Sequence, residues 1–250
     1  MMLVMFFSTS TTLLTNFLTT ILRVDSSHTY SLYIWLLPGY LLGAFICFWW
    51  FRWQRWRFRF LIAGGMACFA FFFGYLYFFL SPDTTYEMLY LPIFFRGLGM
   101  LTLIIAFALF VVEDLNPKFL LMNAFFLITF RSVLAPIMAT SFYSNTLYRL
   151  EQKYMHSLVE TVTMADPLAA SRYGESFGSA LAGGHSYGDA VQMATNSLNT
   201  ALQQQALLLS LKEMLGVLFV VALVIAVISR FIPFHKTLRV TFARTGDDMV

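Results

Sequence analysis

Residues 88–112 read MLYLPIFFRGLGMLTLIIAFALFVV, and residues 119–142 read FLLMNAFFLITFRSVLAPIMATSF. Each stretch can cross a bilayer as a helix, which takes about 20 apolar residues. Each holds one arginine, Arg96 or Arg131, and no acid. A cation in hydrocarbon costs roughly 2.5 kcal/mol or more and usually faces a cavity or a partner. We therefore expect its counter-charge to come from water, backbone carbonyls, a substrate or protein outside this chain.

The composition around these two stretches is that of an integral membrane protein. Hydrophobic residues make up 59% of the 250 residues and charged residues 12%, with a mean hydropathy of +0.71. Soluble domains contain about 25% charged residues. We therefore expect an all-α membrane protein whose main partner is the lipid bilayer. The net charge of +3 gives no reason to expect a nucleic-acid partner.

Six apolar stretches predict a bundle of six transmembrane helices, with a long helical loop before the last one. The helices are expected at Leu3–Leu22, Ser31–Phe51, Phe60–Leu80, Met88–Val112, Phe119–Phe142 and Leu211–Phe234. Residues 1–142 would hold five of them, residues 143–210 the loop, residues 211–234 the sixth, and residues 235–250 a tail. The first stretch lacks a basic leader and a small-residue cleavage site, so we interpret it as a retained helix.

The positions of the basic residues predict the orientation. The connection at 52–59 holds four arginines beside several tryptophans, whereas the connection at 23–30 holds only Arg23. Basic connections stay on the cytoplasmic side, and tryptophan favours the membrane interface. This indicates a multi-pass protein of the plasma (inner) membrane with both termini cytoplasmic and residues 143–210 outside. An RNA-binding role for the basic, aromatic run 52–59 is less favoured, because the flanking spans explain it.

The long outer segment is expected to be partly helical. Residues 144–164 should continue the fifth helix outward, and a Gly/Ser-rich loop should follow, containing Gly174, Gly178 and Gly183. Ser186 with Asp189 three residues later has the pattern of a helix N-cap, so a further helix should start there and lead into the sixth span. A mobile loop with nascent helix is the alternative.

Polar residues within the spans are the candidate site residues. Cavity-lining or gating candidates are Arg131, Arg96, Asn123, Ser8, Thr12, Thr15, Asn16 and Thr19. Four of these hydroxyl residues share a helical face, which indicates either a watery cavity wall or hydrogen bonds to a neighbouring helix. Arg96 and Arg131 lie roughly 12 and 16 Å from the outer ends of their helices at 1.5 Å per residue. Each arginine either ties helix ends and carbonyls together or meets a substrate.

The residue pattern gives no sign of catalysis. The four histidines are scattered in loops, the acids lie in loops or at span ends, and the two cysteines lie in apolar stretches. No metal ligand set, cofactor motif or group of convergent titratable residues is visible, so we expect no metal, no cofactor and no enzyme activity.

Several motifs resemble the drug:proton antiporters with fourteen helices, multidrug efflux carriers of the major facilitator superfamily. The pair Leu91-Pro92 followed by Arg96-Gly97-Leu98-Gly99 is similar to a proline and Arg-Gly-x-Gly pattern in that family. Asn123, Arg131 and Pro136 resemble its next helix, although Ser132–Ile137 replaces the usual glycine-rich stretch. Further matches are Phe17–Leu22, Leu37-Pro38-Gly39, Arg149 with His156, Gln205-Ala206, and the basic turn Arg52–Arg59, which lacks the family's Gly and Asp.

The resemblance covers nearly the whole chain, but only the last six helices of the family. It implies the C-terminal half of a carrier, with the binding cavity between two bundles and the proton-coupling carboxylates largely in the first bundle. A small amphipathic substrate and a separate N-terminal half, or a homodimer, would be its partners. The alternative is a membrane scaffold or accessory protein that does not transport, and an intramembrane enzyme is the least favoured reading.

Overall fold

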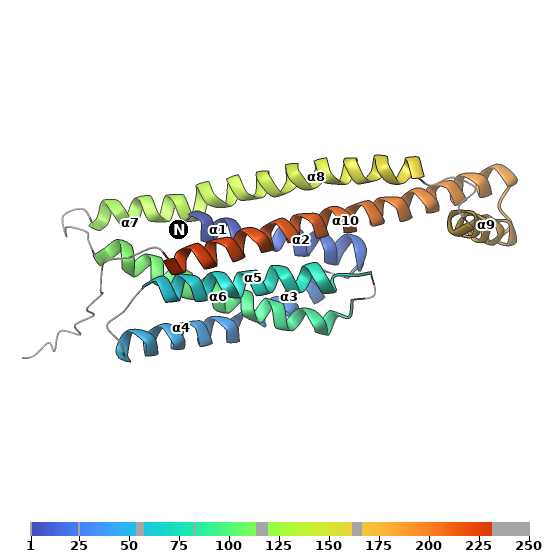
Figure 1. Ribbon diagram of the computed structural model, residues 1–250. Coiled ribbons are helices and arrows are strands. Elements are labelled where there is room, and N and C mark those ends of the chain that lie inside the picture. Colours follow the sequence, from blue (N-terminus) through green and yellow to red (C-terminus); the bar gives the residue numbers. More distant parts are fainter. Residues whose placement is uncertain are drawn as a thin grey trace, which may run out of the picture.

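The computed structural model describes residues 2–24, 26–53, 58–82, 84–113, 120–161 and 167–231, and these residues contain helices and no strand. Figure 1 shows the helices running side by side along one long axis, with α9 and the ends of α8 and α10 extending beyond the others. Within the described ranges, five helical segments are long and apolar enough to cross a membrane: Tyr30–Arg52, Phe58–Phe79, Tyr86–Leu109, Ala124–Thr161 and Tyr187–Phe231. The prediction of an all-α, multi-pass membrane protein is therefore confirmed at this level.

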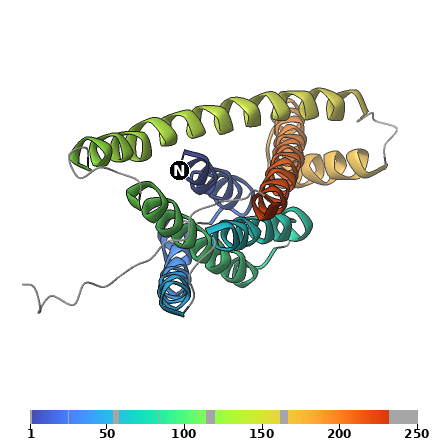
Figure 2. The same cartoon turned by 60° about the vertical axis from the view of Figure 1, so that its left-hand side comes forward.

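Helix α5 lies at the centre of the bundle. It spans Phe58–Phe79, and half of its residues are buried, several of them phenylalanines. It packs between α6 (Tyr90–Glu113) and α10 (Tyr187–Phe231), while α4 (Leu36–Trp53) packs on the far side of α6. Figure 2 shows this order of helices from a second direction. Two short segments, α3 (Ser26–Tyr33) and η2 (Tyr86–Leu89), lead into α4 and α6.

Glycines set the close approach of α6 to both of its neighbours. A Cβ on Gly97 would lie 2.8 Å from the carbonyl oxygen of Leu36 on the α4 side. A Cβ on Gly99 would lie 2.8 Å from the carbonyl oxygen of Gly65 in α5. Residues two apart point to nearly opposite sides of a helix, so this pair serves two interfaces at once. Small residues commonly allow such close helix packing in membranes.

The first apolar stretch is not one spanning helix, so the prediction of six full-length helices is wrong here. The stretch divides into α1 (Met2–Ser8), α2 (Thr11–Asn16) and the π-helix η1 (Phe17–Ile21). The break falls in the run of hydroxyl residues at 8–12. Ser8 and Thr9 Oγ atoms both bond to the carbonyl of Met5 at 2.8 Å, and Ser10 Oγ bonds to that of Phe7 at 2.7 Å. Such side chains compete with the helical backbone pattern and weaken it.

The fifth helix is continuous from residue 120 to residue 161, with an irregularity in the middle. It consists of α7 (Leu120–Thr129), the π-helix η4 (Phe130–Leu134) and α8 (Ala135–Thr161). Pro136 has no N–H to donate to the preceding turn. The N–H of Ala135 bonds to the carbonyl of Phe130, five residues back, which widens the turn. The predicted outward continuation of this helix is confirmed as far as Thr161; its predicted end, Met164, lies outside the described residues.

The predicted Gly/Ser-rich loop is largely a helix. Helix α9 covers Pro167–Ala182, and the turn is confined to residues 183–186, where Gly184 has a φ of +83°. Pro167 suits the first helical position. Helix α9 packs against α10 through small buried alanines, and this packing outweighs the low helix propensity of the glycines in α9. The alanines are Ala169 and Ala180 in α9 and Ala190 and Ala194 in α10.

Helix α10 starts where the capping pattern predicted. Asp189 N–H donates to Ser186 Oγ at 3.3 Å, and Ser186 Oγ donates to Asp189 Oδ2 at 2.7 Å. The helix then continues for 45 residues to Phe231. At 1.5 Å per residue it is roughly 68 Å long, about twice the ~30 Å hydrocarbon core. The predicted helix from Ser186 into the last span is therefore confirmed, and much of α10 extends beyond a bilayer.

Candidate functional site

Arg96 lies in the core of the bundle. It is only 3% exposed, although it belongs to the apolar helix α6. Its Nη2 donates a hydrogen bond to the backbone carbonyl of Ser8, and its guanidinium carbon lies 5.7 Å from the ring centroid of Phe72. The partner of this cation is therefore a carbonyl and an aromatic face. Of the four predicted sources of counter-charge (water, backbone carbonyls, a substrate or protein outside this chain), the structure shows a backbone carbonyl at Arg96.

The carbonyl that Arg96 binds is one of four exposed by the break after α1. The last four carbonyls of a helix have no partner within the helix, and in an apolar core each must find one elsewhere. All four are satisfied here. Met5 O accepts from Thr9 N at 3.0 Å, Phe6 O from Tyr143 Oη at 2.9 Å, Phe7 O from Ser10 N at 3.3 Å, and Ser8 O from Arg96.

Arg96 and Tyr143 therefore perform the same task from two different helices. Each reaches from a distant part of the chain to an end-of-helix carbonyl of α1. A cation is also favoured at a helix C-terminus, where the peptide dipoles leave partial negative charge. The arrangement matches the structural alternative, an arginine that ties a helix end to its neighbours.

Two donors of Arg96 have no partner within the described protein. These are Nε and Nη1, both fully buried. Buried donors of this kind are usually satisfied by ordered water in native proteins. The core around Arg96 is therefore the place in the bundle where we expect internal water.

The hydroxyl stripe of the first stretch is used mainly for local hydrogen bonds. Ser8 Oγ bonds to Met5 O at 2.8 Å, Thr12 Oγ1 to Thr9 O at 3.1 Å, and Thr19 Oγ1 to Thr15 O at 2.9 Å. Among the contacts between described residues, Thr15 alone of these four reaches another segment, where its Oγ1 lies 3.1 Å from Tyr33 Oη. Thr19 and Asn16 are exposed on the bundle surface. The predicted hydrogen bond to a neighbouring helix is therefore seen at Thr15, whereas Ser8, Thr12 and Thr19 bond within their own stretch.

Arg131 has surroundings opposite to those of Arg96. It lies in the π-helix η4 and is exposed on the outside of the bundle. Its neighbours Val133 and Ile137 are also exposed, at 50% and 60%. Within the helical segment Ala124–Thr161, 11% of the most apolar stretch is buried by the rest of the chain. The structure does not bring the two arginines together. The side chain of Asn123, in α7, lies outside the described residues.

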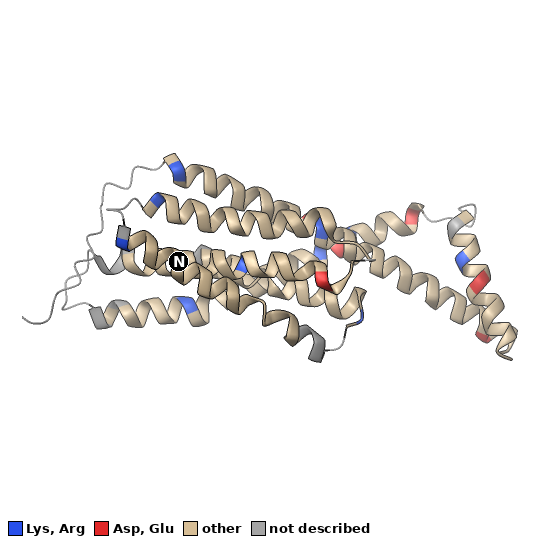
Figure 3. Cartoon of the chain, turned by 90° about the horizontal axis from the view of Figure 1, so that it is seen from below, with Lys and Arg blue, Asp and Glu red and all other residues tan. Residues whose placement is uncertain are grey.

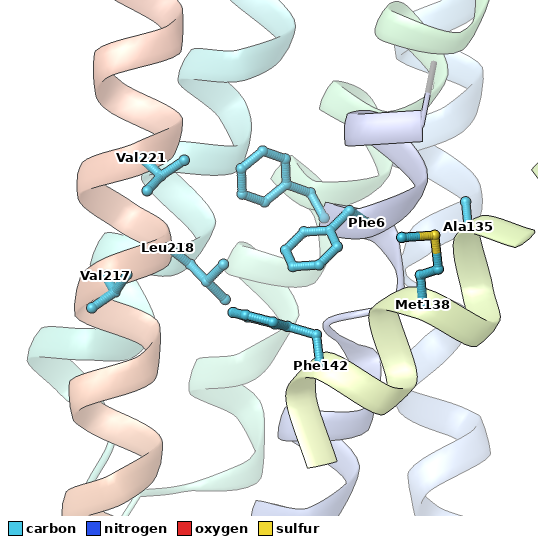
Figure 4. Close-up of a pocket in the computed structure, with 8 residues that line it drawn as sticks. Phe6, Ala135, Met138, Phe142, Val217, Leu218 and Val221 are labelled. Atoms are coloured by element: carbon cyan, nitrogen blue, oxygen red, sulfur yellow. The ribbon is translucent and has the colours of Figure 1, made fainter. Parts of the chain in front are cut away.

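A hydrophobic groove lies between α1, α8 and α10, and sequence reasoning did not identify it. Its volume is about 400 Å³, within the size range of small-molecule sites. Figure 4 shows side chains from all three helices converging on it, among them Phe6, Phe7, Met138, Phe142, Val217 and Val221. No pattern within one helix could have revealed it, because each helix contributes only two or three of these residues.

The groove and the core around Arg96 share one residue, Phe6. The ring of Phe6 lines the groove and lies 5.2 Å from that of Phe142 and 4.9 Å from that of Tyr143. Its carbonyl accepts the hydroxyl of Tyr143. Met138 and Val217, at 59% and 58% exposed, mark the open side of the groove on the bundle surface. The groove therefore opens sideways, toward the surroundings of the bundle.

Other polar contacts lie outside these two features. Tyr154 Oη donates to Glu213 Oε2 at 2.6 Å, which ties α8 to α10. His156 and Glu160 form an exposed pair one turn apart on α8, at 3.4 Å. In the part of the chain that the structure describes, no three His, Cys, Asp or Glu side chains gather where they could hold a metal ion.

A scan of protein-family models and searches of curated proteins and solved structures return no match to this chain. The likeness to the major facilitator carriers therefore rests on the sequence motifs alone.

Proposed function

We propose that this protein forms one bundle of a two-bundle carrier for small amphipathic molecules, as its resemblance to the multidrug efflux carriers implies. In such carriers, transport is a rocking of one bundle against the other around a central site. The second bundle would be a separate N-terminal half or another copy of this chain. We place it in the inner membrane with both termini in the cytoplasm, in line with the basic connection at 52–59.

The observation that supports a second bundle most directly is the exposure of Arg131. A cation at the centre of a lone helix costs at least about 2.5 kcal/mol by insertion scales, unless protein or water covers it. Arg96 shows how this chain satisfies such a cation when it can, with a carbonyl and a ring. Arg131 makes no hydrogen bond or ion pair to any residue that the structure describes. A second bundle packed on α7, η4 and α8 would supply the missing acceptors.

The hydrophobic groove supports an amphipathic substrate. It is lined by apolar atoms, and Tyr143 and Arg96 lie behind its floor at Phe6. An apolar group about the size of two fused rings would fit its volume of about 400 Å³. A substrate dissolved in the bilayer could enter through the open side, between Met138 and Val217.

Proton coupling would depend on the other bundle. A proton antiporter needs a carboxylate that titrates within the membrane, and the apolar stretches of this chain hold acids only at their ends. The chain alone is therefore expected to insert without driving proton-coupled export. A homodimer would supply a second bundle but still no such carboxylate.

The test is dye efflux from energised vesicles that hold this chain alone or together with a matching N-terminal half. Efflux that needs both halves and stops with an uncoupler supports the proposal. Uncoupler-sensitive efflux by the 250-residue chain alone would disprove it. In the two-part carrier, Arg131→Ala should reduce transport more than it reduces membrane abundance, whereas the surface variant Arg172→Ala should change neither. An equal loss of transport and abundance in Arg131→Ala would indicate a structural role only.

One observation favours the alternative of an accessory protein. Helices α8, α9 and α10 extend together well beyond the length that a bilayer requires, and their outer parts are rich in polar residues (Figure 1). Such a projection could hold another protein near the membrane. An accessory protein would leave efflux unchanged in every combination of the vesicle test, so the same experiment separates the two functions.

A further inference from the structure

Two arginines distant in sequence lie over the same aromatic ring at one end of the bundle. The guanidinium carbon of Arg59 is 5.3 Å from the ring centroid of Phe60, and that of Arg230 is 4.2 Å from it. Arg59 lies in the first turn of α5 and Arg230 in the last turn of α10, and the packing of these two helices brings them together. Trp50 of α4 lies on the same ring, at 6.4 Å between centroids.

The positive charge at this end exceeds what the nearby acids can balance. By sequence, the segments that join or follow the helix ends found here contain nine Lys or Arg and four Asp or Glu: Arg52, Arg55, Arg57, Arg59, Lys118, Arg230, Lys236, Arg239 and Arg244 against Glu113, Asp114, Asp247 and Asp248. Figure 3 shows blue segments at the helix ends on this side, whereas red and blue segments both occur toward the other end. An excess of five positive charges at one membrane face attracts anionic lipid.

Arg230 is available to a ligand. It is exposed, and among the described residues it makes no hydrogen bond or ion pair; its contact is the ring of Phe60. Arg59 and Arg230 are both cations near one ring, so an anion beside Arg230 is attracted by both of them. A planar guanidinium binds two phosphate oxygens at once, which makes arginine a preferred phosphate ligand.

The surface beside Arg230 fits the rest of a phospholipid. Moving from Arg230 into the membrane along α10, the exposed side chains are apolar: Ile228 is 51% exposed, Val227 49% and Val224 44%. Acyl chains would lie along this surface while the headgroup stays at the level of the arginines. A free phosphate ion would gain nothing from the apolar surface. A phospholipid accounts both for the two arginines and for the exposed apolar side chains beside them.

We propose that Arg59, Phe60 and Arg230 form a binding site for the phosphate headgroup of an anionic phospholipid, with the acyl chains along α10. The site lies at the opposite end of the membrane span from the α8–α10 projection and is independent of the proposed transport function. Bound lipid would tie the start of α5 to the end of α10 at the interface.

The test compares the thermal stability of the full-length protein in detergent micelles with added phosphatidylglycerol, phosphatidylcholine or inorganic phosphate. Phosphatidylglycerol should raise the Tm by several degrees more than phosphatidylcholine, and inorganic phosphate should have little effect. Equal shifts with the two lipids would overturn the proposal, because the acyl chains alone would then explain the binding. A shift with inorganic phosphate as large as that with phosphatidylglycerol would indicate a free-anion site and would also overturn it.

Variants locate the site. By native mass spectrometry, Arg230→Gln should bind phosphatidylglycerol at least about fivefold more weakly, as expected for one basic residue near a membrane surface. Arg230→Lys should retain part of the affinity, because it keeps the charge and loses the bidentate contact. The control Arg172→Gln, on α9 at the far end, should bind as the unchanged protein does. Undiminished binding of phosphatidylglycerol by Arg230→Gln would overturn the proposed site. If that variant does not fold, the comparison of the two lipids and inorganic phosphate on the unchanged protein tests the proposal instead.

Discussion

Arg96 stabilises the bundle by satisfying a backbone carbonyl that a break in a helix leaves exposed. Replacing it with alanine would leave the carbonyl of Ser8 without its donor and open a void against Phe72. Loss of a hydrogen bond from a charged group costs about 1.5–3 kcal/mol. We expect Arg96→Ala to lower the unfolding free energy by about 2–3 kcal/mol, measured by denaturant titration in micelles.

Arg131→Ala is the matched control, because it removes the same side chain at a similar membrane depth from an exposed position. Its effect on the stability of the isolated chain should stay within about 0.5 kcal/mol. If Arg131→Ala destabilises the protein as much as Arg96→Ala does, Arg96 is not the buried and Arg131 the exposed one of the two arginines.

Tyr143 makes the companion contact, so its hydroxyl should also matter for stability. Tyr143→Phe keeps the ring against Phe6 and leaves only the Phe6 carbonyl without its donor. A buried acceptor left without a partner costs about 1–3 kcal/mol. We expect a loss of that size in the same titration, whereas Tyr148→Phe, at 63% exposed, should have no measurable effect. Equal behaviour of the two variants would show that the contact is not formed.

Part of this residue-level picture follows from sequence and part does not. The cost of a cation in hydrocarbon predicts that each arginine has a partner, and it limits the choice to a few chemical classes. The sequence does not say which arginine turns inward, because both occupy similar positions in similar helices. That choice depends on where α1 breaks and which carbonyls it exposes, which is a property of the packed bundle.

At the scale of elements, the two glycines of the Arg-Gly-x-Gly stretch should be intolerant of a side chain. Gly99→Ala would place a methyl group 2.8 Å from the Gly65 carbonyl oxygen and 2.9 Å from Cys68 Cβ, so α5 and α6 must move apart. We expect a loss of about 1–3 kcal/mol, the usual range for overpacking. Thermal unfolding in micelles measures it.

Gly178→Ala in α9 is the control for helix propensity. No atom lies within 4 Å of its would-be Cβ, and the residue is helical. Alanine should therefore stabilise that helix by about 0.5–1 kcal/mol. A stabilising effect at both positions would show that α5 and α6 are not in close contact at Gly99.

The elements themselves were predictable to different degrees. Long apolar runs such as 60–80 and 88–112 have the length and composition of spans, and the structure has helices there that are long and apolar enough to cross a membrane. The capping pattern at Ser186 and Asp189 is local, so it could be read directly. The break in the first stretch and helix α9 depend on competing hydroxyl bonds and on packing of alanines against α10. Composition alone favoured the opposite result in both places.

At the scale of the whole molecule, the charge distribution predicts the direction of the chain in the membrane. The basic end should face the cytoplasm, and α9 should lie outside. In a background without Cys47 and Cys68, a cysteine at Ser179 should react with a membrane-impermeant reagent in intact cells. One at Thr245, in the tail outside the described residues, should react only after permeabilisation. The reverse pattern would exclude this topology and the carrier reading with it.

The hydrogen bonds that close the end of α1 also have a consequence for biosynthesis. The donors to Ser8 and Phe6 lie 88 and 137 residues downstream of their acceptors. At about 5–20 residues per second, a ribosome needs roughly 7–27 s to reach Tyr143 after making Phe6. Throughout that interval the N-terminal segment has a hydroxyl-rich break and carbonyls without their final donors. It must therefore be held by the insertion machinery or by water until α6 and α8 arrive, so the first segment made cannot reach its final place before the fifth span has been synthesised.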